Sequence, residues 1–134
     1  MSFEINPRLL KSSVPVAVIN GCHVLLKNNC YFPWVLVVPE VEEGVEDLHQ
    51  LSSERYEEVM ALVRKVSVFV EVFFEPEKLN VACIGNQVRQ MHIHVVGRWS
   101  DDPAWPGVVW GSEAKELYSP ERLNEIRSAL AERL

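Results

Sequence analysis

The chain has 134 residues, of which 48% are hydrophobic and 24% are charged, a balance typical of one globular domain with its own core. Its net charge of −6 argues against general nucleic-acid binding through a basic surface. No apolar run approaches the roughly 18 residues that cross a bilayer, and residues 1–4 lack the features of a signal peptide. We therefore expect a soluble, cytoplasmic protein in which Cys22, Cys30 and Cys83, which have no metal-ligand spacing, stay reduced.

The first part of the chain predicts a helical turn and three strands. The turn at 6–11 precedes a strand at 14–19. The Asn-Gly pair at 20–21 is a strong hairpin signal, so 22–26 is predicted to return antiparallel to that strand. The dense apolar run at 34–38 is typical of a central strand that is buried on both faces.

Two helices are predicted, one long and one at the C-terminus. Either Ser52 or Ser53 can cap the long helix, which we expect to end near Phe74. Its apolar residues recur at intervals of three and four and form one stripe: Val59, Met60, Val63, Val66, Val70 and Phe73. Ser119-Pro120 is a typical helix start. The apolar stripe of the last helix is Leu123, Ile126, Leu130 and Leu134.

Between these helices the chain predicts an antiparallel hairpin. Its strands are expected at 78–84 and 88–98, joined by a tight turn at 85–87. Arg89 and Arg98 lie near the two ends of the second strand, and we expect both guanidinium groups to be exposed to solvent.

The second strand of this hairpin carries the pattern on which the functional prediction depends. The run 90–96 reads Gln-Met-His-Ile-His-Val-Val, with polar and apolar residues in alternation. Because successive side chains of a strand point to opposite faces, Gln90, His92 and His94 are predicted to share one face. Their apolar neighbours are then free to pack against a core.

Three interpretations of the two histidines stay open from the residues alone. They are incidental side chains of a half-buried strand, or they bind zinc, which needs at least one more ligand that no matching carboxylate or cysteine supplies. The third is phosphorus chemistry, for which a largely neutral imidazole is a good nucleophile. Amides at Asn86 and Gln87 can donate to phosphate oxygens, and Gly85 allows close backbone approach. No metal or cofactor is predicted.

The run 90–96 resembles the motif of the histidine triad (HIT) superfamily of nucleotide hydrolases and transferases, His-φ-His-φ-His-φ-φ with φ apolar, except that Gln90 replaces the first histidine. Asn80, followed by Gly-Asn-Gln-Val at 85–88, resembles the family's Asn…Gly-Gln-Ser/Thr-Val run. The segment 32–39 resembles the strand that holds the sugar and base of the nucleotide.

The resemblance implies roles for individual residues. His92 corresponds to the nucleophile, which attacks an α-phosphorus through Nε2 while a backbone carbonyl holds its Nδ1–H. The nucleotidyl-histidine is then hydrolysed by water. His94 is expected to contact the phosphate or the leaving oxygen. Phosphate or ribose contacts are implied for Asn80, Asn86, Gln87, and Asn28 or Asn29.

The substitution at Gln90 is expected to affect rate and substrate choice. Gln90 is grouped with the catalytic residues because its amide can orient the backbone or the phosphate, although it cannot act as an acid or a base. In the family the first histidine is often close to another histidine, whose place Trp34 takes here. We therefore expect that the side chains around His92 are packed differently from those of the family, and that His92 itself is retained as the nucleophile.

We predict an α+β, HIT-like fold with about five antiparallel strands, one long helix across the sheet and a C-terminal helix. One domain is expected over 1–134, with a core at about 12–100 and a C-terminal tail and helix at 101–134. The implied function is hydrolysis or nucleotidyl transfer at an α-phosphate of dinucleoside polyphosphates or nucleoside phosphoramidates, by a homodimer with no membrane partner. The alternatives are a nucleotide-binding module with little catalysis and a metal-dependent hydrolase.

Overall fold

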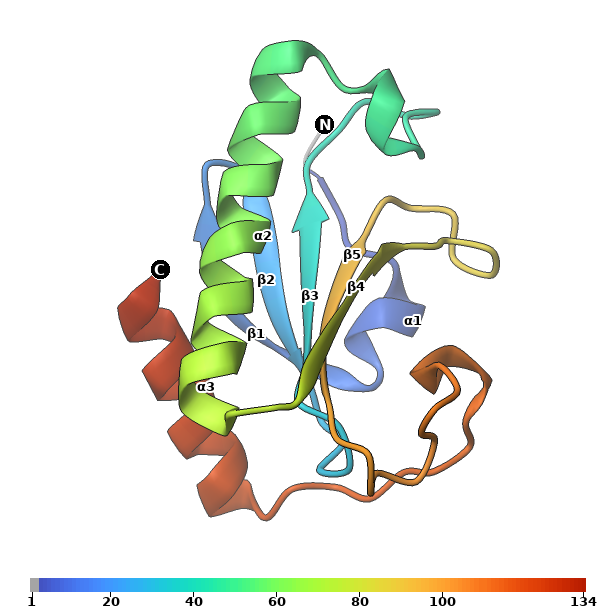
Figure 1. Ribbon diagram of the computed structural model, residues 1–134. Helices are drawn as coiled ribbons and strands as arrows, with labels where there is room; N and C mark the ends of the chain where they lie inside the picture. The colour runs from blue at the N-terminus through green and yellow to red at the C-terminus, as the bar shows by residue number, and fades with distance from the viewer. Residues whose placement is uncertain (1–2) are drawn as a thin grey trace.

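Five antiparallel strands form one sheet in the computed structural model, which describes residues 3–134 (Figure 1). The strands are β1 (Ser13–Ile19), β2 (Cys22–Lys27), β3 (Trp34–Pro39), β4 (Lys78–Cys83) and β5 (Ile93–Arg98), in the spatial order β1-β2-β3-β5-β4. The helices are α1 (Pro7–Leu10), α2 (Ser53–Phe74) and α3 (Pro120–Arg133), with 3-10 turns η1 (Leu48–Gln50) and η2 (Val109–Gly111). The predicted α+β fold is confirmed.

The turn between β1 and β2 forms where the sequence predicts it. Asn20 and Gly21 both have positive φ, 49° and 66°, as a two-residue type I′ turn requires. Ile19 pairs with Cys22 on either side of the turn. In β1, an edge strand, the register shifts after Pro15, where the missing N–H is tolerated.

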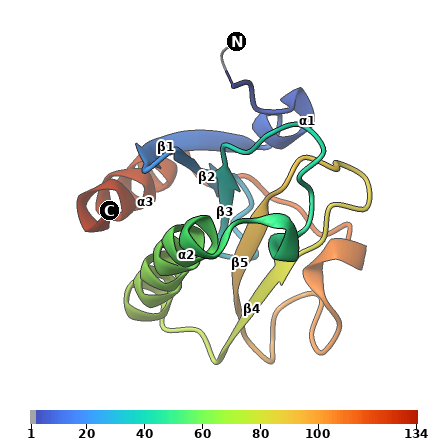
Figure 2. The same ribbon diagram turned by 90° about the horizontal axis from the view of Figure 1, so that it is seen from above.

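Helices α2 and α3 cover the same face of the sheet, which we call the helix face, while α1 lies on the other side (Figure 2). The Ser52 hydroxyl caps α2 by accepting the Arg55 N–H. Buried α2 residues are Val59, Leu62, Val63, Val66, Phe69 and Val70, so the predicted stripe is confirmed with Met60 and Phe73 half-buried at its margin. Ile126 and Leu130 of α3 join this core. None of the helices within residues 3–134 has both the length and the apolar character needed to cross a membrane.

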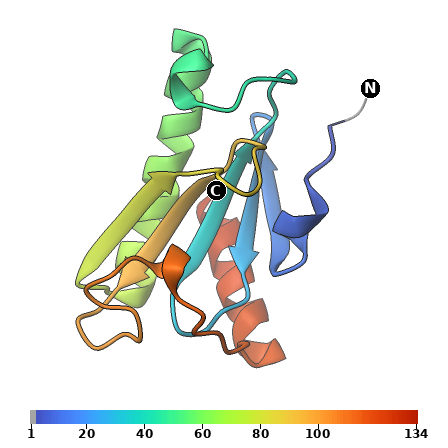
Figure 3. The same cartoon turned by 90° about the vertical axis from the view of Figure 1, so that its right-hand side faces the viewer.

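The opposite face, which we call the open face, is covered by the N-terminal segment and by the connection between β5 and α3. Figure 3 shows this connection, in orange, crossing in front of the strands, with α2 and α3 behind them. Because side chains alternate along β3, Val35 and Val37 enter the helix-face core, whereas Trp34 and Leu36 enter a second apolar cluster on the open face. The three central strands, β2, β3 and β5, thus each contribute side chains to both clusters.

The strand with the histidines is shorter than predicted. β5 begins at Ile93, whose pairing with Cys83 is the last one between β4 and β5. Residues 84–92 leave the sheet, and Gly85 has a positive φ of 72° that disfavours other residues. The antiparallel pairing of the two strands is confirmed, but the prediction of a tight turn and a strand from 88 is wrong.

Arg98, at the end of β5, is 1% exposed, so the prediction that its guanidinium is solvated is wrong. Its Nε and Nη2 donate to the two carboxylate oxygens of Asp102 at 2.7 and 3.0 Å, and its Nη1 donates to Asn80 Oδ1 at 2.8 Å. Burial raises the pKa of Asp102, but Arg98 and three backbone N–H donors outweigh it and lower the pKa to about 2. This charged pair fastens the start of the connection to the sheet.

Candidate active site

A cavity of about 580 Å³ lies on the open face, between the sheet, residues 84–88 and the connection after β5. His92 and His94 line it, and each residue is only 6% exposed. Their ring centroids are 4.7 Å apart with the planes at 63°. The structure therefore confirms that the two imidazoles share one space, although His92 precedes the strand and His94 is within it.

The tautomer of His92 is determined by a backbone contact. Its Nδ1 lies 2.7 Å from the carbonyl oxygen of Gln90. A carbonyl only accepts, so Nδ1 carries the proton and Nε2 keeps its lone pair. Burial lowers the pKa of His92, with a smaller opposing effect of the Gln90 carbonyl and a further lowering by Lys27. The predicted backbone hold on Nδ1–H is present, and the ring is a neutral potential nucleophile.

His94 has the opposite tautomer because an indole donates to it. The Nε1–H of Trp34 donates to His94 Nδ1 at 3.0 Å, so the proton of the neutral His94 ring is on Nε2. Burial, followed by the charge that His92 carries when it is protonated and by the charge of Lys27, lowers the pKa of His94 to about 3. One ring therefore offers a lone pair at Nε2 and the other offers an N–H at Nε2.

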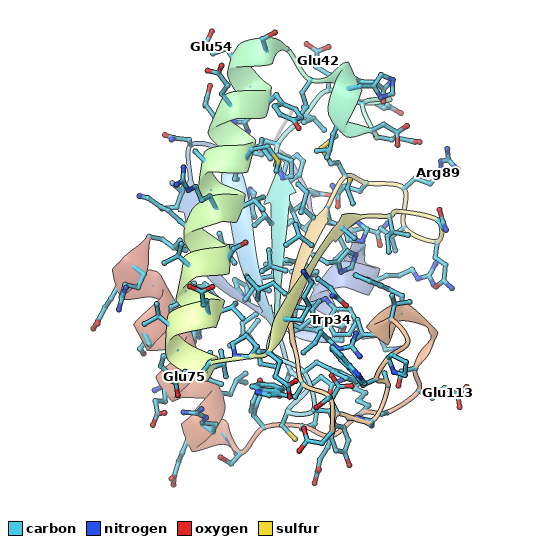
Figure 4. All side chains as sticks on the ribbon, in the orientation of Figure 1. Trp34, Glu42, Glu54, Glu75, Arg89 and Glu113 are labelled. Carbon is cyan, nitrogen blue, oxygen red and sulfur yellow. The ribbon has the colours of Figure 1, made fainter. Side chains whose placement is uncertain are left out.

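Aromatic rings surround His94 on the open face. Trp110, from η2, meets the His94 ring edge-on at 5.2 Å and 82°, and it meets Trp34 at 6.2 Å and 82°. Figure 4 shows Trp34 within the body of the molecule, whereas Arg89 and Glu113 project from its edge. These rings exclude water from one side of His94 and account for the depth of its burial.

The segment before β5 contributes backbone and amides to the cavity. Gly85, Asn86 and Gln87 all line it, as their sequence pattern predicts. A Cβ on Gly85 would lie 3.2 Å from the Val88 carbonyl oxygen, so there is little room for a side chain at this left-handed position. Gln87 is also tied to α1, because its Oε1 accepts from Arg8 Nη2 at 3.3 Å.

Gln90 does not share the cavity with the histidines, so the prediction that its side chain lies on their face is wrong. Its Oε1 accepts the Asn6 N–H at 2.8 Å, and its Nε2 donates to the Glu4 carbonyl at 2.9 Å. The physical reason is that Gln90 precedes the strand, so the alternation of strand side chains does not apply to it. The Gln90 side chain holds the N-terminal segment, and the Gln90 backbone carbonyl holds His92.

Comparison with known proteins now identifies the family. The HIT domain matches residues 12–101, two thirds of the chain. The chain belongs to the HIT domain family. No curated protein matches it in sequence.

Solved structures of bacterial histidine triad proteins resemble the whole chain. One from Marinobacter aquaeolei VT8 is 32% identical, with a TM-score of 0.90 over 98% of this chain and 96% of that one. One from Sinorhizobium meliloti 1021 is 28% identical, with a TM-score of 0.91 over 99% and 98%. One from Bradyrhizobium japonicum is 26% identical, with a TM-score of 0.92 over the same shares. The likeness thus extends beyond the matched HIT domain to the tail and α3.

The other amides expected of the HIT site have structural partners. Asn80 does not line the cavity; its Oδ1 accepts from Arg98. Asn28 and Asn29 line it, but both are tied to the tail: Asn28 Oδ1 accepts the Tyr118 N–H at 2.9 Å, and Asn29 Nδ2 donates to the Ala114 carbonyl at 3.1 Å. These amides position the walls of the HIT cavity.

Several lining residues were not recognised from the sequence, among them Arg8, Lys27, Trp110 and Lys115. Lys27 could have been found, because it is two residues after Leu25 on the strand face that points to the open side. Trp110 and Lys115 come from a segment without periodicity and outside the matched HIT domain. Within residues 3–134, no three His, Cys, Asp or Glu side chains cluster in a way that could hold a metal ion.

Proposed function

We propose that this chain is a nucleotide phosphohydrolase or nucleotidyl transferase that cleaves dinucleoside polyphosphates or nucleoside phosphoramidates at the α-phosphate. Membership of the HIT family supports a nucleotide-binding or hydrolase role in general. The observation that carries the proposal is the hydrogen bond from His92 Nδ1–H to the Gln90 carbonyl, because it keeps Nε2 unprotonated in a residue that lines the cavity.

The first step forms a bond between His92 Nε2 and the α-phosphorus while the bond from phosphorus to the leaving atom breaks, with its electron pair going to that atom. The resulting ring carries positive charge, which the Gln90 carbonyl stabilises through Nδ1–H. In the second step water adds to phosphorus, the N–P bond returns its electron pair to Nε2, and the proton of the water passes to solvent.

Three further side chains are proposed to act on the substrate. His94 donates its Nε2–H to the leaving atom or to a phosphoryl oxygen, since Trp34 holds its other nitrogen. Asn86 and Gln87 donate amide N–H groups to the phosphate and do not change its charge.

Trapping of the intermediate tests the proposal. A dinucleoside tetraphosphate is mixed with the protein, and intact-protein mass is measured within the first turnovers. We expect a mass increase of one nucleotidyl group. His92→Ala should abolish this increase and lower kcat/KM by at least about 10³-fold.

His49→Ala is the matched control, because His49 is exposed and does not line the cavity. It should retain the adduct and the rate. Nucleotide binding without adduct or turnover would reject the enzyme and indicate a nucleotide-binding module.

We also propose that the protein is a cytoplasmic homodimer. Support comes from β4, an edge strand whose Val81 is 45% exposed, and from Val68 and Val72 of α2, which are 48% and 55% exposed. Edge strands and exposed apolar side chains favour association. Light scattering at micromolar concentration should give twice the chain mass, and Val81→Lys should halve it.

A further inference from the structure

The cavity is positively charged although the chain is acidic. Arg8, Lys27 and Lys115 line it, and Glu113 is its one lining carboxylate among the residues that the structure describes. The whole chain has a net charge of −6, so basic side chains are concentrated at the cavity although the chain as a whole is acidic. A local excess of positive charge in a concave site attracts anionic ligands.

Lys27 and Lys115 face the same space from different parts of the chain. Lys27 ends β2, is half-buried, and has its Nζ 4.1 Å from the centroid of the Trp34 ring. Burial lowers the pKa of Lys27, and the charge of Lys115 lowers it further. Neither lysine makes an ion pair within residues 3–134, where the pairs are formed by other side chains. An anion between the two ammonium groups would relieve this repulsion.

The neighbouring histidine suits the same kind of ligand. His94 is held neutral with its proton on Nε2, because Trp34 donates to Nδ1. A neutral imidazole donates a hydrogen bond but gives up its proton only with great difficulty. An amine must gain a proton to leave, whereas the oxygen of a phosphoanhydride leaves as an anion and needs only a hydrogen bond.

We infer that Lys27 and Lys115 form an anion subsite beside His94 for a phosphate-bearing leaving group that departs as an oxyanion. This inference rests on the proposed function, and within it selects dinucleoside polyphosphates over phosphoramidates. The bond from the α-phosphorus to the bridging oxygen breaks, its electron pair stays on that oxygen, and the two lysines bind the departing phosphates. No proton is transferred in this step. Lys115 lies beyond the matched HIT domain, so the subsite belongs to the tail as much as to the domain.

The ratio of two specificity constants tests the subsite. kcat/KM is measured for a dinucleoside tetraphosphate and for a phosphoramidate of the same nucleoside. Lys115→Gln should lower the ratio of the first to the second about tenfold, because one charged contact to the leaving group is lost. Lys65→Gln, an exposed lysine of α2, is the control and should leave the ratio unchanged. An equal loss on both substrates in Lys115→Gln would overturn the inference.

Binding of inorganic tripolyphosphate separates this inference from the proposed function, because it needs no catalysis. Calorimetry should show binding to the wild type that Lys27→Gln and Lys115→Gln each weaken about tenfold. If His92 forms no adduct but tripolyphosphate binds in this way, the proposed reaction fails and the subsite stands. If the adduct forms and tripolyphosphate binds equally to all variants, the subsite is wrong and the reaction stands.

Discussion

The two faces of the sheet are made by the same strands but are stabilised in different ways. On the helix face, residues such as Val35, Val37 and Val95 pack against α2 and α3 in an apolar core. On the open face, their neighbours Trp34 and His94 are joined by a directional hydrogen bond. Adjacent residues of one strand therefore make different kinds of contact. One side chain packs in an apolar core, and the next forms a hydrogen bond that depends on its protonation state.

This difference has a consequence for mutation. The helix face tolerates exchange among apolar residues of similar volume, since burial is its main source of stability. The open face depends on particular donors and acceptors, and on segments from both ends of the chain that hold them in place. Substitutions on the helix face should thus change stability alone, whereas substitutions in the cavity of the open face should also change the proposed activity.

The largest effect is expected where the open face is fastened at its edge. Asp102→Ala should lower the free energy of unfolding by about 3–5 kcal/mol, because it leaves the Arg98 guanidinium buried without its partner. Urea denaturation measures this loss. Asp101→Ala, an exposed neighbour, should change stability by less than about 0.5 kcal/mol. Equal values for the two variants would contradict a structural role for the pair.

A matched pair of leucines compares the faces directly. Leu26 (0% exposed, helix face) and Leu36 (2% exposed, open face) are both buried, so each change to Ala should lower the free energy of unfolding by about 2–5 kcal/mol. Only Leu36 lines the cavity, so only Leu36→Ala should change kcat/KM at temperatures where both variants are folded. A kinetic change in Leu26→Ala as well would remove the distinction between the faces.

A smaller effect is expected from the indole that orients His94. Trp34→Phe keeps an aromatic ring but removes the donor to Nδ1, so kcat should fall roughly tenfold and the pKa of His94 should rise. Nitrogen NMR of the imidazole should show a mixture of tautomers.

Trp110→Phe is the control for that variant. Trp110 touches the same ring, yet its Nε1 is buried without a hydrogen-bond partner in the described part of the chain. The Trp110→Phe variant should therefore leave the tautomer of His94 unchanged. A tautomer mixture in Trp110→Phe would show that ring packing, and not the hydrogen bond, orients His94.

The pH dependence of stability should come from the open face. The folded-state pKa of His94 is about 3 against 6.5 when unperturbed, so its contribution is complete above about pH 6.5 and is lost as the pH falls toward 3. His94 alone changes the free energy of unfolding by at most about 1.4 kcal/mol per pH unit, and His92 adds a change in the same direction. His94→Asn should flatten the pH curve of urea unfolding in this window, and Leu26→Ala should shift the curve without changing its slope.

The sequence predicted the helix face better than the open face, for a physical reason. Periodic apolar residues such as Val63 and Val66 report their own burial, so α2 and its stripe were recognised. Gln90 took partners from the distant N-terminal segment, at Glu4 and Asn6, and Arg98 paired with Asp102 in the irregular loop that follows its strand. Such pairings leave no periodic signal. The contact between His92 Nδ1 and a backbone carbonyl, which the resemblance to the family implied, is present, since it lies within the motif itself.

The contact between His92 and the carbonyl of Gln90 has an evolutionary consequence. Every amino acid carries the same backbone carbonyl, so no codon change at position 90 can delete the group that holds the His92 ring. The side chain at this position can therefore be a glutamine that binds the N-terminal segment without any loss of that acceptor. A survey that searched only for three histidine side chains in the motif would discard this chain, although the backbone acceptor for His92 Nδ1–H is present.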